Sequence, residues 1–323
     1  MNKFPIKYVL YILAVIIIGF FLLRNHSPFG KNNTSFAVKP GTQITRIVFL
    51  QGEKKLILRK VDDDWTVNGE DEVRKSAVLF IVRTLEEIKI KSPVSPDIFS
   101  KEIIDKKIEP VRVNVYHRSR LVKSFYVYKT GSNIYGNIMK MRPSSKPYIV
   151  YIPGYEDNIG SHFILNELFW QPYIVYKLLP SQIESVTMQN YGNPESSFII
   201  RKAEYNFLLE DHEGSLSGYD SLRVKRYISY FTSIPFESWA FDLDEDEIKI
   251  ITSSTPLYRI TVKVSGGGSS TLTIWQRWIT KNGRSVKDTD RVWARIGENS
   301  GIFIMRYFDI DPILKKKSYF FGD

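Results

Sequence analysis

The sequence predicts an α+β protein with an N-terminal transmembrane helix followed by two homologous domains, each an antiparallel sheet with one main amphipathic helix. Two observations support this fold class. An apolar segment of bilayer length occupies residues 4–23, and the chain after residue 180 repeats the pattern of the chain after residue 44.

The first repeat begins with short apolar segments that are typical of strands. Residues 44–50 (ITRIVFL) and 55–60 (KLILRK) predict two strands, and a polar turn at residues 62–64 precedes the aromatic residue Trp65. Residues 73–90 carry apolar side chains at helical spacing. A short helix from Ser95 and four further strands follow, at residues 111–116, 121–128, 134–139 and 148–152. We expect one face of this antiparallel sheet to be covered.

A second repeat is indicated by a constant offset between the two halves of the chain. Arg59 and Trp65 match Arg201 and Phe207, because 201 − 59 and 207 − 65 both equal 142. A strand, a turn of fixed length and an aromatic residue therefore recur together. Similarity at a fixed long period is evidence for duplication.

The rest of the second repeat keeps the same order of elements. Leu85 in the predicted helix matches Phe231, and 231 − 85 gives an offset of 146. Strands are predicted at residues 259–264, 271–278, 291–296 and 301–306. The alignment also places Tyr135 and Trp293 at the same strand position.

These patterns divide the chain into four parts. They are a membrane anchor at residues 1–24, a polar tether at 25–43, a first repeat domain at 44–180 and a second at 181–323. The first domain is expected to end in a helix-like connection over residues 162–179, broken at Pro172.

The apolar segment predicts an anchor and a location. Its twenty residues, apolar apart from Lys7, would span about 30 Å as a helix. Bulky residues 20–24 (FFLLR) follow where a signal-peptide cleavage site would need small ones, so we expect the segment to stay attached. Export by such a segment predicts an inner-membrane, single-pass protein with the bulk of the chain in the periplasm. No cysteine is present, so no disulfide holds the fold.

The net charge of +10 does not predict nucleic-acid binding. Residues 1–40 contain five basic and no acidic side chains, which leaves 40 basic against 35 acidic residues in the remainder. No basic cluster interleaved with aromatic residues occurs in that remainder. The basic residues that flank the apolar segment are better explained by anionic lipid.

No catalytic, cofactor-binding or metal-binding residues are predicted. The four histidines have no zinc-ligand spacing. The acidic run at residues 242–247 lacks the glycine and glutamate of a calcium loop, because Glu247 and Ser253 occupy those positions. The run is therefore interpreted as the start of a helix, where carboxylates are favourable.

Aromatic residues are the remaining candidates for a binding role. Tyr126 and Tyr128 lie on one predicted strand, and Trp275 and Trp278 lie on its counterpart in the second repeat. An exposed aromatic strip of this kind could contact a partner or a glycan. The alternative is that these four side chains are buried under a helix.

The repeated pattern resembles a known family. Its features are residues 58–60 leading to residues 65–67, the aromatic residues Tyr135 and Trp293, and the connection at residues 168–183. Together they resemble a duplicated domain of unknown function in Bacteroidetes-like bacterial envelope proteins, found with ABC-transporter permeases and in gliding-motility auxiliary proteins. The resemblance implies an exported, membrane-anchored, repeat-built protein without catalytic residues.

The predicted function is that of a membrane-anchored periplasmic scaffold or partner-binding subunit of an envelope or transport assembly, without enzymatic activity. Its expected partners are the membrane, through the N-terminal helix, and an envelope protein, but no nucleic acid. No cofactor is expected. The alternative is an envelope hydrolase, or a glycan-binding or glycan-modifying protein whose site assembles only in the folded chain.

Overall fold

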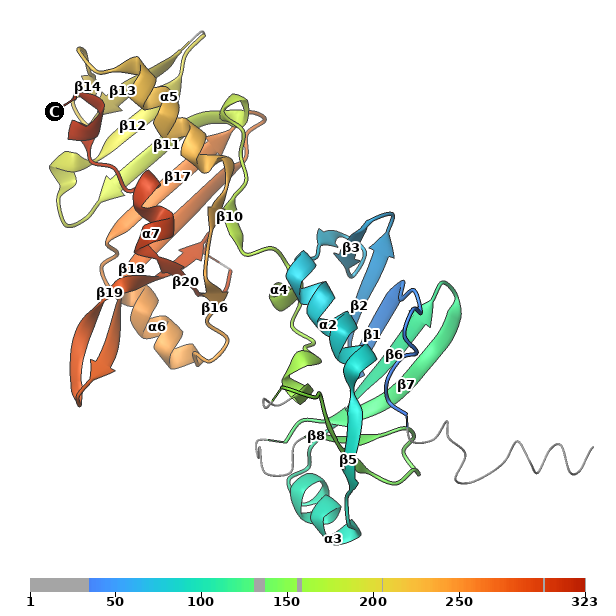
Figure 1. The fold of residues 1–323 in the computed structure, drawn as a ribbon. Coiled ribbons are helices and arrows are strands. Elements are labelled where there is room, and N and C mark those ends of the chain that lie inside the picture. The colour runs from blue at the N-terminus through green and yellow to red at the C-terminus, as the bar shows by residue number, and fades with distance from the viewer. Residues whose placement is uncertain (1–34, 131–136, 156–158, 205, 299, 323) are drawn as a thin grey trace, which may run out of the picture. The chain divides into compact units, whose positions relative to one another are not determined.

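The computed structural model describes residues 35–130, 137–155, 159–204, 206–298 and 300–322. The chain divides after Pro172 into two compact units (Figure 1). Each unit has a hydrophobic core of its own, formed by residues between Phe36 and Trp170 in the first and between Tyr176 and Phe320 in the second. The division falls eight residues before the boundary expected at residue 180, since 180 − 172 is 8.

The first unit is built on one antiparallel sheet of nine strands among its described residues, in the order β4-β3-β2-β1-β6-β7-β8-β9-β5. The strands are β1 (Arg46–Gln51), β2 (Lys54–Val61), β3 (Asp64–Val67), β4 (Asp71–Glu72), β5 (Lys89–Pro93), β6 (Val111–His117), β7 (Arg120–Tyr128), β8 (Asn137–Lys140) and β9 (Tyr148–Tyr151). Alternating apolar side chains of these strands form the core face, as period-2 patterning requires.

The second unit has a sheet of the same strand order, β14-β13-β12-β11-β17-β18-β19-β20-β16. Its strands are β11 (Ile183–Asn190), β12 (Phe198–Lys202), β13 (Phe207–Asp211), β14 (Gly214–Ser215), β16 (Ser238–Trp239), β17 (Tyr258–Val264), β18 (Ser269–Lys281), β19 (Arg284–Ile296) and β20 (Phe303–Arg306). A separate pair joins β10 (Ile174–Tyr176) to β15 (Ile234–Pro235).

The pairing register carries the same correspondence down to single residues. Lys60 pairs with Trp65 across β2 and β3, and Lys202 pairs with Phe207 across β12 and β13. Trp293 pairs with Trp275, and Ile138 pairs with Tyr128 at the equivalent place in the first unit. The position of Trp293 therefore corresponds to Ile138, and the alignment with Tyr135, which lies outside the described residues, is wrong.

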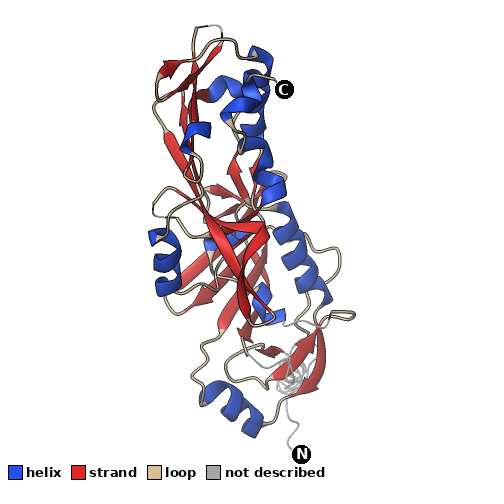
Figure 2. Ribbon diagram, turned by 90° about the vertical axis from the view of Figure 1, so that its left-hand side faces the viewer, coloured by secondary structure: helices blue, strands red, loops and turns tan. Residues whose placement is uncertain are grey.

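A helix covers the core face of each sheet (Figure 2). These helices are α2 (Lys75–Glu87) and α5 (Ser221–Ser229), which bury apolar residues such as Ile81 and Tyr227. Other helices pack on the opposite face. In the first unit α3 (Pro96–Phe99) continues into a π-helical turn at Ser100–Ile104, and in the second unit α6 (Glu245–Ser253) takes the corresponding place. Small apolar clusters lie beneath them, one around Tyr128 and one around Trp275.

The segments that lead into and out of each sheet also correspond. The backbone N–H of Val38 donates to the carbonyl of Leu85, and Leu178 donates to Phe231 in the same way. Phe36 and Val38 are each 1% exposed, although they fall within the segment expected to be a tether. The expected helix-like connection over residues 162–179 is mostly extended chain with one short helix, α4 (Glu167–Trp170), before β10.

The predicted α+β class is wrong, because the protein is mostly β. Strands account for 42% of the structure and helices for 25%. The difference comes from strands that the sequence pattern under-predicts: β18 and β19 each extend over 13 residues. Edge strands such as β4 and β16 increase the strand content further, and strands of only two residues have no periodicity to detect.

The predicted single-pass, inner-membrane architecture is corrected as well. Within the described part of the chain, no helix is both long enough and apolar enough to cross a membrane. The segment that carried the prediction, residues 4–23, lies outside the described residues.

Candidate functional site

The four aromatic residues predicted as contacts do not form one exposed strip. Tyr128 and Trp275 are 8% and 3% exposed and lie under the short helices of their units. Tyr126 is half-buried, and Trp278 is 54% exposed. Of the four, only Trp278 therefore presents most of its ring to solvent.

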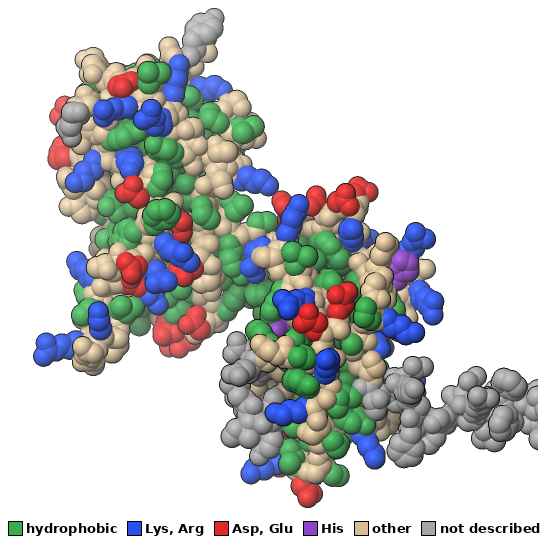
Figure 3. All heavy atoms as spheres, viewed as in Figure 1, with side chains coloured by type: hydrophobic (Ala, Val, Ile, Leu, Met, Phe, Trp, Pro, Cys, Tyr) green, Lys and Arg blue, Asp and Glu red, His purple; other side chains and the backbone are tan. Residues whose placement is uncertain are grey.

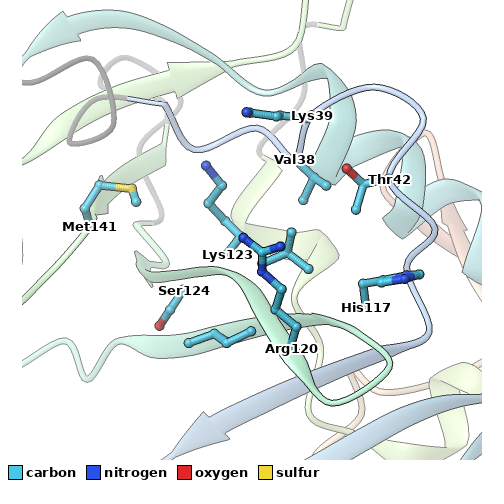
Figure 4. Close-up of a pocket in the computed structure, with 10 residues that line it drawn as sticks. Val38, Lys39, Thr42, His117, Arg120, Lys123, Ser124 and Met141 are labelled. Carbon is cyan, nitrogen blue, oxygen red and sulfur yellow. The ribbon is translucent and has the colours of Figure 1, made fainter.

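A cationic pocket lies at one edge of the first unit (Figure 4). It has a volume of about 560 Å³ and combines residues 120–124 of β7 with Val38, Lys39 and Thr42 from the segment that precedes β1. His117, at the end of β6, and Met141, just after β8, complete the lining. The pocket thus depends on tertiary contact between segments far apart in the sequence.

The hairpin between β6 and β7 positions the basic residues. Its turn contains Arg118, whose φ of 52° lies in the left-handed region. The Arg118 N–H donates to Thr45 Oγ1 at 2.6 Å, which ties the turn to the residue just before β1. His117 Nδ1 donates to the carbonyl oxygen of Gln43 at 2.7 Å. These bonds fix the hairpin end against the segment that supplies the other wall of the pocket.

The charge in the pocket is of one sign. Lys39, Arg120 and Lys123 direct their charged ends into it (Figure 4), and none of its ten lining residues is acidic. Burial, followed by the positive charge of Lys39, lowers the pKa of Lys123. Lys123 Nζ donates to the carbonyl oxygen of Ser35 at 2.8 Å, a neutral partner that leaves the charge uncompensated. Such a pocket favours an anion.

The backbone beside these side chains is also incompletely paired. Residues 126–128 of β7 pair with β8, whereas residues 120–125 have a strand neighbour on the β6 side alone among the described residues. Alternate residues of a strand direct their N–H and C=O groups to opposite sides, so this edge offers hydrogen-bonding groups. Leu121, at the same edge, is 47% exposed.

Two other groups of polar side chains contain residue types that enzymes use for catalysis. His162 lies within 3.0 Å of Thr84 Oγ1 and 3.1 Å of the Tyr155 hydroxyl, but Thr84 is 1% exposed and has no route to a substrate. A cavity in the second unit is lined by Glu195 and Asp211. Lys317 donates to Asp211 at 2.7 Å and lowers the pKa of that carboxyl, which disfavours it as a general acid.

The acidic run at residues 242–247 is the start of a helix, as interpreted from the sequence. Asp244 accepts a hydrogen bond from the backbone N–H of Glu247, and the Glu247 carboxylate accepts one from the N–H of Asp244. This reciprocal pair is a capping box. Figure 3 shows acidic side chains gathered at this end of α6. No cluster of metal-ligating side chains occurs among the described residues.

The basic pocket was not predicted from the sequence, although one signal was present. Four of the seven residues from 117 to 123 (HRSRLVK) are basic or histidine, and none is acidic. The contribution of Lys39 could not be seen, because it depends on the fold of the segment before β1.

Comparison with known proteins gives no match. No protein-family model, no curated protein sequence and no solved structure is significantly similar to this chain. The resemblance to an envelope domain family therefore stays a prediction.

Proposed function

We propose that this protein is a non-enzymatic partner-binding protein, and that the cationic pocket of its first unit takes an extended acidic segment of another protein. The observation that carries the proposal is the edge of β7 at residues 120–125, which pairs with no second strand among the described residues and which lies beside Lys39 and the pocket. Both the backbone and the side chains of this edge are complementary to such a segment.

Strand addition would provide the affinity. A partner segment laid antiparallel or parallel to β7 would satisfy the free N–H and C=O groups of this edge. Its alternate side chains would face the pocket, because successive side chains of a strand point to opposite sides. Glutamate or aspartate at those positions would meet Lys39 and Lys123.

Electrostatics would provide specificity. Half-buried Lys123 has no acidic partner in the described protein, and the neighbouring Lys39 raises the local positive potential. An incoming carboxylate would relieve the repulsion between the two ammonium groups, and this gain would weaken as added salt screens the charges.

Titration calorimetry with a synthetic ten-residue peptide of alternating glutamate and valine tests the proposal. We expect saturable binding that weakens with salt. The double variant Lys39→Gln/Lys123→Gln should bind at least about tenfold more weakly, since each lost charge pair contributes on the order of 1 kcal/mol. Lys55→Gln, an exposed lysine on β2 away from the pocket, is the matched control and should bind like the parent.

A second peptide separates strand addition from simple charge attraction. In it, alternate backbone nitrogens carry methyl groups, so that the residues facing β7 cannot donate hydrogen bonds. Equal affinity for the methylated and unmethylated peptides would rule out strand addition. Tighter binding of a single-stranded oligonucleotide of equal charge would rule out a protein partner. Circular dichroism of each variant checks that the fold is intact.

A further inference from the structure

A polar cleft of about 850 Å³ lies on the sheet of the second unit, on the face opposite α5. Arg259, Thr273 and Arg295 form a cross-strand row over β17, β18 and β19, with Arg259 opposite Thr273 and Thr273 opposite Arg295. Six hydroxyl side chains line the same cleft: Thr252, Thr261, Ser269, Ser270, Thr271 and Thr273.

The two arginines of this cleft have no carboxylate partner among the described residues. Arg259 lies over the ring of Tyr191 at 5.8 Å, and Arg295 lies over the ring of Trp275 at 5.8 Å. The Nε atom of Arg295 is buried without a hydrogen-bond partner. Glu298 is the only acidic residue in the lining, and it forms no ion pair with either arginine.

The first unit has cations at the same two positions, with a tyrosine between them. Its row is Arg112, Tyr126 and Lys140, paired in the same register over β6, β7 and β8. Arg112 lies over the Tyr126 ring at 5.9 Å, so the aromatic side chain occupies the place that Thr273 leaves open in the second unit. Threonine is much smaller than tyrosine, and Thr273 lines the cleft between the two arginines.

We propose that this cleft binds an acidic sugar, that is, a hydroxyl-rich ligand carrying one carboxylate or phosphate group. The oxyanion would lie between Arg259 and Arg295, whose guanidinium groups suit planar or tetrahedral oxyanions. The hydroxyl side chains and the amide of Gln189 would serve the ligand hydroxyls, since each can donate and accept. The volume falls within the range of small-molecule sites.

The hydroxyl groups of the cleft are held in place by the sheet. Thr261 and Thr271 pair across β17 and β18, with their hydroxyl oxygens 3.0 Å apart. Asn114 and Ser124 pair in the equivalent place of the first unit, where Ser124 donates to Asn114 at 2.7 Å. Side chains fixed in this way lose little conformational entropy when a ligand binds.

Titration calorimetry on the full chain with glucuronate, glucose 6-phosphate, glucose and inorganic phosphate tests the site. We expect saturable binding of glucuronate, glucose 6-phosphate or both, no binding of glucose, and at least tenfold weaker binding of phosphate alone. Arg259→Gln and Arg295→Gln should each weaken binding of the acidic sugar about tenfold or more. Lys281→Gln, at the far end of β18, should leave it unchanged.

Thr273→Tyr is the decisive variant, because it copies the residue at the equivalent position of the first unit without changing the charge. It should keep the fold and abolish binding of the acidic sugar. The proposal is overturned if neither acidic sugar saturates the protein, if phosphate alone binds as tightly, or if folded Thr273→Tyr protein binds like the parent. Loss of binding in Arg259→Gln, Arg295→Gln and Thr273→Tyr distinguishes this cleft from the cationic pocket of the first unit, because none of these residues lines that pocket.

Discussion

The backbone N–H of Arg74, at the start of α2, donates to the carbonyl oxygen of Trp170 at 2.7 Å. In the second unit the N–H of Asp220, at the start of α5, donates to Phe320 at the same distance. Each helix thus has one of its first N–H groups satisfied by a buried aromatic residue near the end of its unit.

In both units, side chains also join the start of the helix to the end of the unit. Arg74 Nη2 donates to the carbonyl oxygen of Phe169 at 3.2 Å, and Arg223 Nη1 donates to that of Tyr319 at 2.9 Å. Each guanidinium also lies over the ring of the residue to which it donates, at 5.4 Å and 5.7 Å. The short segment that ends each unit is therefore a structural part of its core.

Replacement of Trp170 or Phe320 by alanine should strongly destabilise the unit to which the residue belongs. Trp170 and Phe320 are 1% and 0% exposed, and we expect Trp170→Ala and Phe320→Ala each to cost about 3–5 kcal/mol of unfolding free energy. Urea denaturation followed by circular dichroism measures this loss. Phe308→Ala, at a residue that is 87% exposed, is the control and should change stability by less than about 0.5 kcal/mol.

The second unit should fold without the first. The core around Tyr227 contains residues of the second unit alone, and β10 belongs to it. A fragment of residues 173–323 should show a cooperative urea transition, whereas one that starts at residue 181 should be less stable because it lacks Tyr176 and the β10–β15 pair. Equal stability of the two fragments would contradict this expectation.

Asp288 should make the second unit sensitive to acid. Burial alone would raise the pKa of this carboxyl, but hydrogen bonds from the backbone N–H groups of Asp290 and Arg291, together with Arg277, outweigh it and lower the pKa. A lowered pKa in the folded state contributes stability above the ordinary value of 3.8, and that stability is lost as the pH falls through the lowered pKa.

Comparison with Asp288→Asn isolates this effect. The variant should be less stable than the parent at pH 7 by roughly 1–3 kcal/mol, since it loses charge-assisted hydrogen bonds. Its unfolding free energy should also fall less steeply between pH 5 and pH 2. Parallel stability curves for the two proteins over that interval, measured by urea denaturation, would show that Asp288 is not the group responsible.

Lys123 should react with amine-directed reagents at lower pH than a fully solvated lysine. Burial and the nearby charge of Lys39 lower its pKa, which increases the fraction of neutral, nucleophilic amine. The pH profile of labelling, read by mass spectrometry, should have a lower midpoint for Lys123 than for exposed Lys55. Lys39→Gln should move that midpoint upward, and an unchanged midpoint would argue against coupling between the two lysines.

The sequence predicted the repeated part of the fold where strand spacing is regular. The offset that joins Arg59 to Arg201 and Trp65 to Phe207 identifies equivalent pairings, because Lys60–Trp65 and Lys202–Phe207 occupy the same register. The sequence comparison misplaced Trp293, because the chain between β7 and β8 differs in length from that between β18 and β19. Only the cross-strand pairing shows that Trp293 corresponds to Ile138.

No local sequence pattern shows which residues meet in the two candidate sites, or where the short edge strands lie. Lys39 and Lys123 meet only because the segment before β1 folds beside β7, and Arg259 and Arg295 become neighbours only through sheet register. The amount of strand was underestimated for the same reason. Two-residue edge strands such as β16 gain their conformation from the partner strand and not from their own pattern.

Trp170 and Phe320 lie near the ends of their units, and this position sets an order for folding during synthesis. The first unit can complete its core once Trp170 has left the ribosome, while the second must wait until Phe320 has done so. Until then the apolar ends of β12 and α5, where Phe198 and Tyr227 meet Phe320, stay uncovered. We therefore expect the nascent second unit to be the part of the chain that chaperones bind longest.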